Sequence, residues 1–254
     1  MSLRFLSLVL LATLSIPGFT RDLRVCADPD NLPYSRRDGS GFENRIAGIV
    51  ADELAAKLVY TWHPQQRAFV RKTIGADLCD VWMGVPSDFE RVLTTKPYYR
   101  SSYVFVFAKG RALTSFEQAN LPQLKIGVQL PGDDLAATPP GHALALRGAV
   151  DNVVGYTIFG EGTAAERIVD AIAKGRLDAG VVWGPQAGFF AMKRHLELAS
   201  AKAPAELSMP FEFSISMGVK HGQPALRDEL DAVIERRRGD IDAVLTEYAV
   251  PLVR

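Results

Sequence analysis

The sequence predicts an α/β protein built as two lobes, each with a parallel sheet covered by helices. Short apolar runs bounded by turn residues alternate with helical periodicities, and this alternation occurs twice along the 254 residues. Two apolar strands, Tyr103–Phe107 and Phe211–Val219, bracket the second set and are expected to be crossover connections. The first lobe then comprises residues 21–107 and 214–254, the second comprises residues 108–213, and a cleft lies between them.

The first lobe follows from spacing and turn residues. Apolar residues at helical spacing between Ile46 and Leu58 predict a helix. A short helix is expected at Ala68–Ile74, because Gly75 follows it and suits a left-handed cap. The expected strands are Leu23–Ala27, Val59–His63 and an apolar run that begins at Val81 and ends at Gly84.

A capping box follows the Val81 strand. Ser87 precedes Glu90 by three residues, a spacing in which each side chain satisfies a free backbone amide of a helix start. We therefore expect a short helix whose amino end lies at the carboxyl tip of this strand, where open α/β sheets bind ligands. The alternative is an ordinary strand-to-helix connection without a functional role.

The second lobe repeats the same pattern. Thr138 is expected to cap a helix with Pro139 at its first position, and Thr163 with Glu166 forms a second capping box. A further helix begins at Gly184. The expected strands are Lys125–Gln129, Val153–Ile158 and Ala179–Trp183, and two amphipathic helices, around residues 226–234 and 241–248, close the chain.

The amino terminus predicts an exported protein. Arg4 precedes an apolar core, Phe5–Ile16, that is too short to cross a membrane as a helix. Pro17 and Gly18 then interrupt the apolar run, so residues 1–20 are predicted to be a signal peptide for the periplasm. A buried amino-terminal strand is the alternative. No later segment is long and apolar enough for a membrane span, so none is expected in the mature protein.

Charge and cysteine content narrow the function classes. The chain has 29 basic and 29 acidic residues, a balance that gives no overall field to attract nucleic acid. Its two cysteines are Cys26, in the first strand, and Cys79, at the start of the Val81 strand. If these strands are neighbours, an oxidising compartment favours a disulfide between them, and two buried thiols are the alternative.

Several phrases in order resemble the type II periplasmic solute-binding proteins. They are VWMGVPSDFERVLTTKPY from Val81 to Tyr98, KIGVQ from Lys125 to Gln129 and KGRLDAGVV from Lys174 to Val182. The resemblance covers nearly all of the mature chain. It implies the fold already expected: two α/β lobes joined by two crossover strands.

Other phrases resemble, more narrowly, the MxaJ and XoxJ proteins encoded with quinoprotein methanol dehydrogenases. They are LRVCADPDNLPYS from Leu23, GFENRIA from Gly41, LCDVWMGVP from Leu78 and TTKPYYRSSYVFV from Thr94. This resemblance implies a periplasmic accessory protein that binds a dehydrogenase dependent on pyrroloquinoline quinone (PQQ) and assists its maturation or activation. The chain itself is expected to hold no cofactor. The alternative is a transporter's solute-binding protein for an unidentified small molecule.

The resemblance also implies that an amino-acid clamp is incomplete. Arg91 falls where amino-acid-binding members place an arginine for the ligand carboxylate, a match for a guanidinium fork. Pro86, however, replaces a hydroxyl residue and cannot donate a hydrogen bond. Trp183, Gly184 and Pro185 occupy the region where an acid often pairs with the ligand's amino group. The chain is therefore predicted not to bind free amino acids tightly.

The candidate cleft residues separate the two interpretations. If the chain serves a transporter, Tyr34, Arg67, Arg91 and Gln129 should converge on one point. If it serves a dehydrogenase, the cleft should lack convergent polar groups. The complete candidate set is Asp28, Tyr34, Arg67, Ser87, Arg91, Gln129 and Trp183.

Catalysis and metal binding are not expected. The four histidines, at positions 63, 142, 195 and 221, have no metal-ligand spacing. Glu43 and Asp28 could in principle act as a general acid and base in an enzyme of this fold. Glu43, however, is expected near the start of a helix, where the dipole favours its charged form and opposes its use as an acid.

Overall fold

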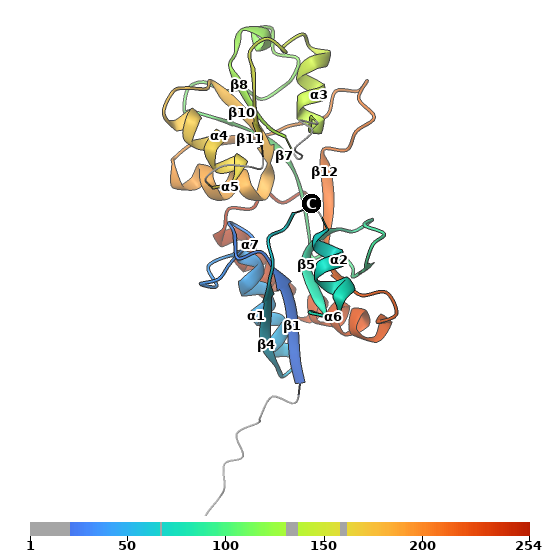
Figure 1. Cartoon of the computed structure of the whole chain (residues 1–254). Helices are drawn as coiled ribbons and strands as arrows, with labels where there is room; N and C mark the ends of the chain where they lie inside the picture. Colours follow the sequence, from blue (N-terminus) through green and yellow to red (C-terminus); the bar gives the residue numbers. More distant parts are fainter. Residues whose placement is uncertain (1–20, 67, 131–136, 158–161) are drawn as a thin grey trace, which may run out of the picture.

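In the computed structural model, which describes residues 21–66, 68–130, 137–157 and 162–254, two groups of elements lie on either side of a pair of long strands (Figure 1). One group holds the amino-terminal strands and the carboxyl-terminal helices, and the other holds the elements between them. This is the predicted α/β architecture. The predicted signal peptide, residues 1–20, and Arg67 lie outside the described residues.

The first group is built on three parallel strands. Strand β1 (Arg21–Ala27) lies between β4 (Ala56–Trp62) and β5 (Val81–Pro86) and pairs with both. Four helices belong to this group: α1 (Phe42–Glu53), α2 (Phe69–Lys72), α6 (Pro224–Arg236) and α7 (Arg238–Glu247). The loops carry the short strands β2 (Asp30–Asn31), β3 (Ser35–Arg36) and β6 (Leu93–Thr94) and the 3₁₀ turn Ile74–Ala76.

The second group has β8 (Ile126–Leu130) between its parallel neighbours β9 (Val153–Thr157) and β10 (Ala179–Trp183). Its helices are α3 (Pro139–Leu146), α4 (Ala164–Ala173) and α5 (Gly184–Lys193). A 3₁₀ turn, Leu121–Gln123, precedes β8, and strand β11 (Glu197–Ser200) follows α5. The order of β8, α3, β9, α4, β10 and α5 agrees with the sequence expectation, whereas β11 was not expected.

The crossover strands are β7 (Tyr99–Phe107) and β12 (Glu212–Val219), and they pair antiparallel. The first half of β7 contacts β12, whereas the second half lies between β10 and β11. The hydrogen-bonded path is therefore continuous, in the order β4-β1-β5-β12-β7-β10-β8-β9. The two sheets expected from the sequence thus share β7, and the residue boundaries of the two lobes stay a prediction.

The predicted disulfide is confirmed. Cys26 lies opposite Trp82 in the β1–β5 ladder, so the strands are neighbours, and Cys26 and Cys79 are bonded with their Cα atoms 5.5 Å apart. Both cysteines are buried in a small cluster with Phe69 and Ile74. The bond therefore links β1 to the loop that leads into β5.

Helix starts agree with the sequence in part. Thr163 caps α4 as predicted, accepting a hydrogen bond from the Glu166 amide at 3.1 Å. Thr138 precedes α3, but its hydroxyl instead donates to the carbonyl of Gln129 at 3.1 Å. The Thr138 side chain therefore ties the helix to β8 rather than capping it.

The two groups also touch through their helices. Phe189 of α5 stacks on Tyr248, just after α7, with ring centroids 5.7 Å apart. Gly188 lies so close to the Ala249 carbonyl that an added Cβ would be 1.9 Å from its oxygen. The chain then runs beside β7, where the Ser101 hydroxyl donates to the Pro251 carbonyl.

Across the part of the chain that the structure describes, no helix is both long and apolar enough to span a membrane.

Candidate functional site

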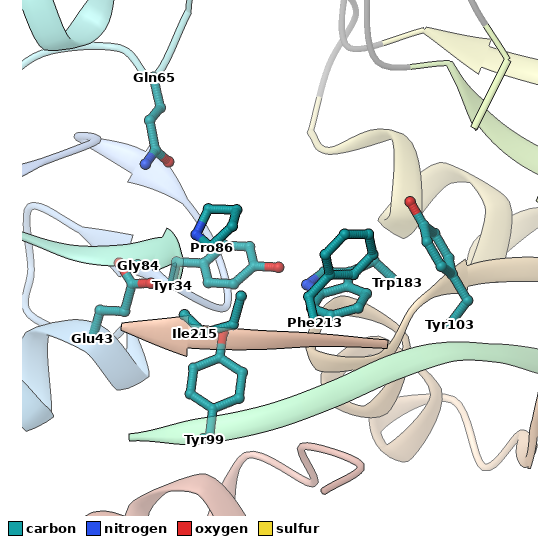
Figure 2. Close-up of a pocket in the computed structure, with 10 residues that line it drawn as sticks. All are labelled: Tyr34, Glu43, Gln65, Gly84, Pro86, Tyr99, Tyr103, Trp183, Phe213 and Ile215. Carbon is teal, nitrogen blue, oxygen red and sulfur yellow. The ribbon is translucent and has the colours of Figure 1, made fainter. Parts of the chain in front are cut away.

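A cavity of about 290 Å³ lies beside the crossover strands (Figure 2). The crossover strands contribute four lining residues, and the first group of elements contributes five more. Trp183, at the end of β10, comes from the second group. The full lining is Tyr34, Glu43, Gln65, Gly84, Pro86, Tyr99, Tyr103, Trp183, Phe213 and Ile215. Such a cavity between two groups of elements is a usual place for a small-ligand site.

One end of the cavity is aromatic. The Trp183 ring meets the edges of Tyr103 and Phe213 at centroid distances of 5.5 Å each, and Figure 2 shows the three side chains together. The Trp183 amide donates to the Gln129 side-chain oxygen at 3.0 Å, and the Gln129 amide group donates to Gln186 at 2.8 Å. Gln129 therefore positions Trp183 where β10 passes into α5.

Glu43 lies at the opposite end, beside Gly84 (Figure 2). It belongs to the first turn of α1, and only 7% of its surface is exposed. Its carboxyl makes no hydrogen bond to any residue that the structure describes. Burial raises the pKa of Glu43 to about 8. The expectation that the helix dipole keeps this carboxyl charged is therefore wrong, because desolvation outweighs the dipole.

Tyrosines surround this carboxyl. Burial, and then the nearby Glu43 charge, hold the pKa values of Tyr34 and Tyr98 well above the ordinary value. Burial, and then the neighbouring phenols of Tyr98 and Tyr34, do the same for the pKa of Tyr99. The phenol of Tyr98 is fully buried and has no hydrogen-bond partner among the described residues. Burial alone raises the pKa of Tyr103 to about 12. All four phenols therefore stay neutral and polar at physiological pH.

Asp28 supports the cavity without lining it. Its carboxylate accepts hydrogen bonds from the backbone amides of Gln65, at 2.5 Å, and Asp30, at 2.9 Å. Gln65 is itself a lining residue. Asp28 therefore fixes the loop that presents Gln65, and it is not the second carboxylate that an acid–base pair with Glu43 requires.

Ser87 does not begin a helix. Its amide and hydroxyl both donate to the Ser214 carbonyl, at 2.9 and 3.0 Å, and its hydroxyl also bonds that of Ser216. Residues 87–92 form turns and bends, so the predicted helix is wrong. The pairing of β5 with β12 extends to Ser87. The Ser87 side chain therefore bonds to β12 and does not cap a helix.

The predicted residues converge only in part. Tyr34 and Trp183 line the cavity, and Gln129 holds Trp183. Arg91 is exposed and lines a different hollow with Ala68, Arg71 and Lys72. Pro86 lines the cavity, as the incomplete clamp implied, and no arginine, lysine or histidine is among the lining residues that the structure describes. The expected failure to bind amino acids stays a prediction.

Comparison with known proteins places the chain in a family. It is 31% identical over 246 residues to the protein MoxJ of Methylorubrum extorquens, which covers 91% of this chain and 81% of that one. It is 29% identical over 248 residues to MoxJ of Paracoccus denitrificans, covering 92% and 90%. The chain belongs to the MoxJ family. No protein-family model matches it.

Solved structures agree with this MoxJ-family assignment. The periplasmic binding protein XoxJ of Methylobacterium extorquens is 37% identical, with a TM-score of 0.76 and coverage of 91% of this chain and 99% of that one. MxaJ of Methlophaga aminisulfidivorans, at 24% identity and a TM-score of 0.79, covers 91% and 100% and shares the fold. An ancestral cationic amino acid solute-binding protein also shares the fold, at 20% identity, a TM-score of 0.69 and coverage of 90% and 95%. The type II periplasmic-binding-protein fold is thereby confirmed.

Sequence reasoning missed several lining residues of this MoxJ-family cavity. Tyr103, Phe213 and Ile215 belong to crossover strands that were expected to connect the lobes, not to form a site. Alternation along those strands could have found them, because every second residue faces the same side. Among the described residues, no group of three or more histidines, cysteines or acids could hold a metal.

Proposed function

We propose that this chain is a periplasmic accessory protein of methanol oxidation that binds a PQQ-dependent methanol dehydrogenase and assists its maturation or activation. The observation that carries the proposal is the 37% identity to XoxJ across 99% of that chain, together with MoxJ relatives of similar length. Resemblance to the J proteins implies the dehydrogenase partner. The lining of the cavity supports a function other than amino-acid transport, since its described residues offer no cation for a ligand carboxylate.

Affinity capture tests this proposal. The purified chain, and an unrelated periplasmic binding protein as control, are immobilised and exposed to periplasmic extract of the source organism grown on methanol. We expect the dehydrogenase subunits to be recovered with the chain and not with the control. The isolated dehydrogenase, with and without PQQ, is then titrated against the chain to separate binding during maturation from binding to the finished enzyme. Absence of the dehydrogenase from both measurements would refute the proposal.

Delivery of a solute to a transporter is the second candidate, and the cavity itself favours it. On this alternative, a tightly held small molecule is released when the purified chain is denatured, and the extract yields a permease. Mass spectrometry of the released small molecules, made on the same preparation, distinguishes the two functions.

A further inference from the structure

The cavity has an unusual inventory of ionisable groups. Among the residues that the structure describes, its lining contains one carboxyl, from Glu43, three phenols, from Tyr34, Tyr99 and Tyr103, and no basic side chain. A ligand carboxylate or phosphate would find no counter-charge there and would meet the Glu43 carboxyl. A cation would find an acceptor. The charge inventory therefore favours a cationic ligand over an anionic one.

Glu43 lacks the partners that a buried carboxyl ordinarily has. A carboxylate can accept about four hydrogen bonds, and buried polar groups are nearly always paired. Within residues 21–66, 68–130, 137–157 and 162–254, Glu43 has no side-chain hydrogen bond, although only 7% of its surface is exposed. The Glu43 Oε1 atom occupies the space that a side chain at Gly84 would fill, and Glu43 lines the cavity. The unused acceptors therefore face the cavity.

The far end of the cavity suits an apolar body attached to that cation. Trp183, Tyr103 and Phe213 lie opposite Glu43, with no charged group among them (Figure 2). Aromatic rings cover apolar surface and also attract cations through their π electrons. The volume of about 290 Å³ leaves room for roughly ten water-sized groups. A molecule with one ammonium and a small hydrocarbon body satisfies both ends.

We propose that this cavity binds a small organic ammonium ion whose charged group pairs with the Glu43 carboxylate and whose apolar body packs against Trp183 and Phe213. This inference concerns a ligand that membership of the MoxJ family does not specify. It is independent of the dehydrogenase partner, because it depends only on residues of the cavity.

Binding is coupled to a proton. Burial raises the pKa of Glu43 to about 8, so the empty cavity holds a neutral carboxyl at pH 7. Among the described residues, the titratable groups that face it are the phenols of Tyr34, Tyr60, Tyr98 and Tyr99, all with raised pKa values, so none of these supplies a counter-charge. An entering ammonium supplies that charge, lowers the pKa and releases the proton. Affinity should therefore rise with pH until the carboxyl is already ionised.

The test uses four probes of nearly one shape: 2-phenylethylamine, 2-phenylethanol, 3-phenylpropanoate and L-phenylalanine. Each is titrated calorimetrically into the full mature chain at pH 6, 7 and 8, in buffers that differ in their heat of ionisation. We expect the amine to bind at least about tenfold more tightly than the alcohol, and the two carboxylates not to bind. Amine affinity should rise by up to about tenfold per pH unit below the pKa, with nearly one proton released at pH 7.

Two variants test whether Glu43 causes the preference for the amine and its pH dependence. Glu43→Gln keeps the shape and removes the charge, so it should lose the preference for amine over alcohol, the pH dependence and the proton release. Glu90→Gln, at an exposed glutamate outside the cavity, should change none of them. If Glu43→Gln does not fold, Glu43→Asp should weaken amine binding while keeping its pH dependence. The proposal is overturned if amine and alcohol bind equally, if amine binding survives Glu43→Gln, or if the amine gives no heat at millimolar concentration.

Discussion

Gly84 and Glu43 occupy one small volume at the end of the cavity. A Cβ built on Gly84 would lie 2.1 Å from the Glu43 Oε1 atom, well inside van der Waals contact. Strand β5 can therefore carry only glycine at this position while the carboxyl keeps its place. The close contact between Gly84 and Glu43 determines the effect of substituting Gly84, and the burial of the Glu43 carboxyl determines how stability depends on pH.

Gly84→Ala should destabilise the protein by about 1 kcal/mol, because the added methyl forces the Glu43 carboxyl, the end of a flexible side chain, out of its position. Chemical denaturation measures the loss. Gly48→Ala on α1 is the matched control, since its Cβ would meet nothing within 4 Å and alanine favours a helix. Glu43→Ala in the Gly84→Ala background should recover part of the loss, and a double variant with simply additive losses would contradict the proposed clash.

Stability should depend on pH through Glu43. The folded-state pKa of about 8 lies above the ordinary value of 4.5, so the folded state holds this proton more tightly than the unfolded chain does. This contribution is fully present below about pH 4.5 and is lost as pH rises towards 8, by up to about 1.4 kcal/mol per pH unit. In Glu43→Gln, the free energy of unfolding should lose this part of its dependence on pH between pH 5 and 8. Urea denaturation of the native chain and of Glu43→Gln at several pH values in this range measures the change. If the free energy of unfolding varied with pH equally in both, the result would count against a buried protonated carboxyl.

The disulfide should contribute substantially to stability. Cys26 and Cys79 are 53 residues apart, and a cross-link over such a loop restricts the unfolded chain. Reduction should lower the free energy of unfolding by about 2–4 kcal/mol. Denaturation with and without a reductant measures the change, and the double variant Cys26→Ala/Cys79→Ala should be insensitive to the reductant. If the reductant destabilised the double variant as much as the native chain, the loss of stability would not come from breaking this disulfide.

Gln129 should matter for the position of Trp183. Gln129→Leu leaves the Trp183 amide and Gln186 without their partner, a loss expected to destabilise the fold by about 1–3 kcal/mol. The tryptophan fluorescence of the folded protein should also change, because Trp183 lies at the cavity. Gln123→Leu, at an exposed position in a 3₁₀ turn, is the control and should have little effect. An unchanged emission spectrum in Gln129→Leu would argue against this positioning role.

Short-range patterns were sufficient for most elements. The Thr163 cap, the strand at Ala179–Trp183 and the closing amphipathic helices depend on residues within a few positions of each other, so local spacing predicts them. The disulfide was predicted on the condition that the strands carrying the two cysteines are neighbours, a condition that the fold meets. Phrases distributed along the chain were enough to indicate the family and the fold.

Tertiary contacts decided the site. Ser87 carries a helix-start signal, but β12, more than a hundred residues away in sequence, takes its hydrogen bonds. Arg91 lies in a separate hollow because residues 87–92 turn instead of forming a helix. The charge of Glu43 is set by burial beneath β5 and among tyrosines from distant segments. Local sequence specifies the start of α1, but desolvation depends on everything packed around it, and only the folded chain determines that.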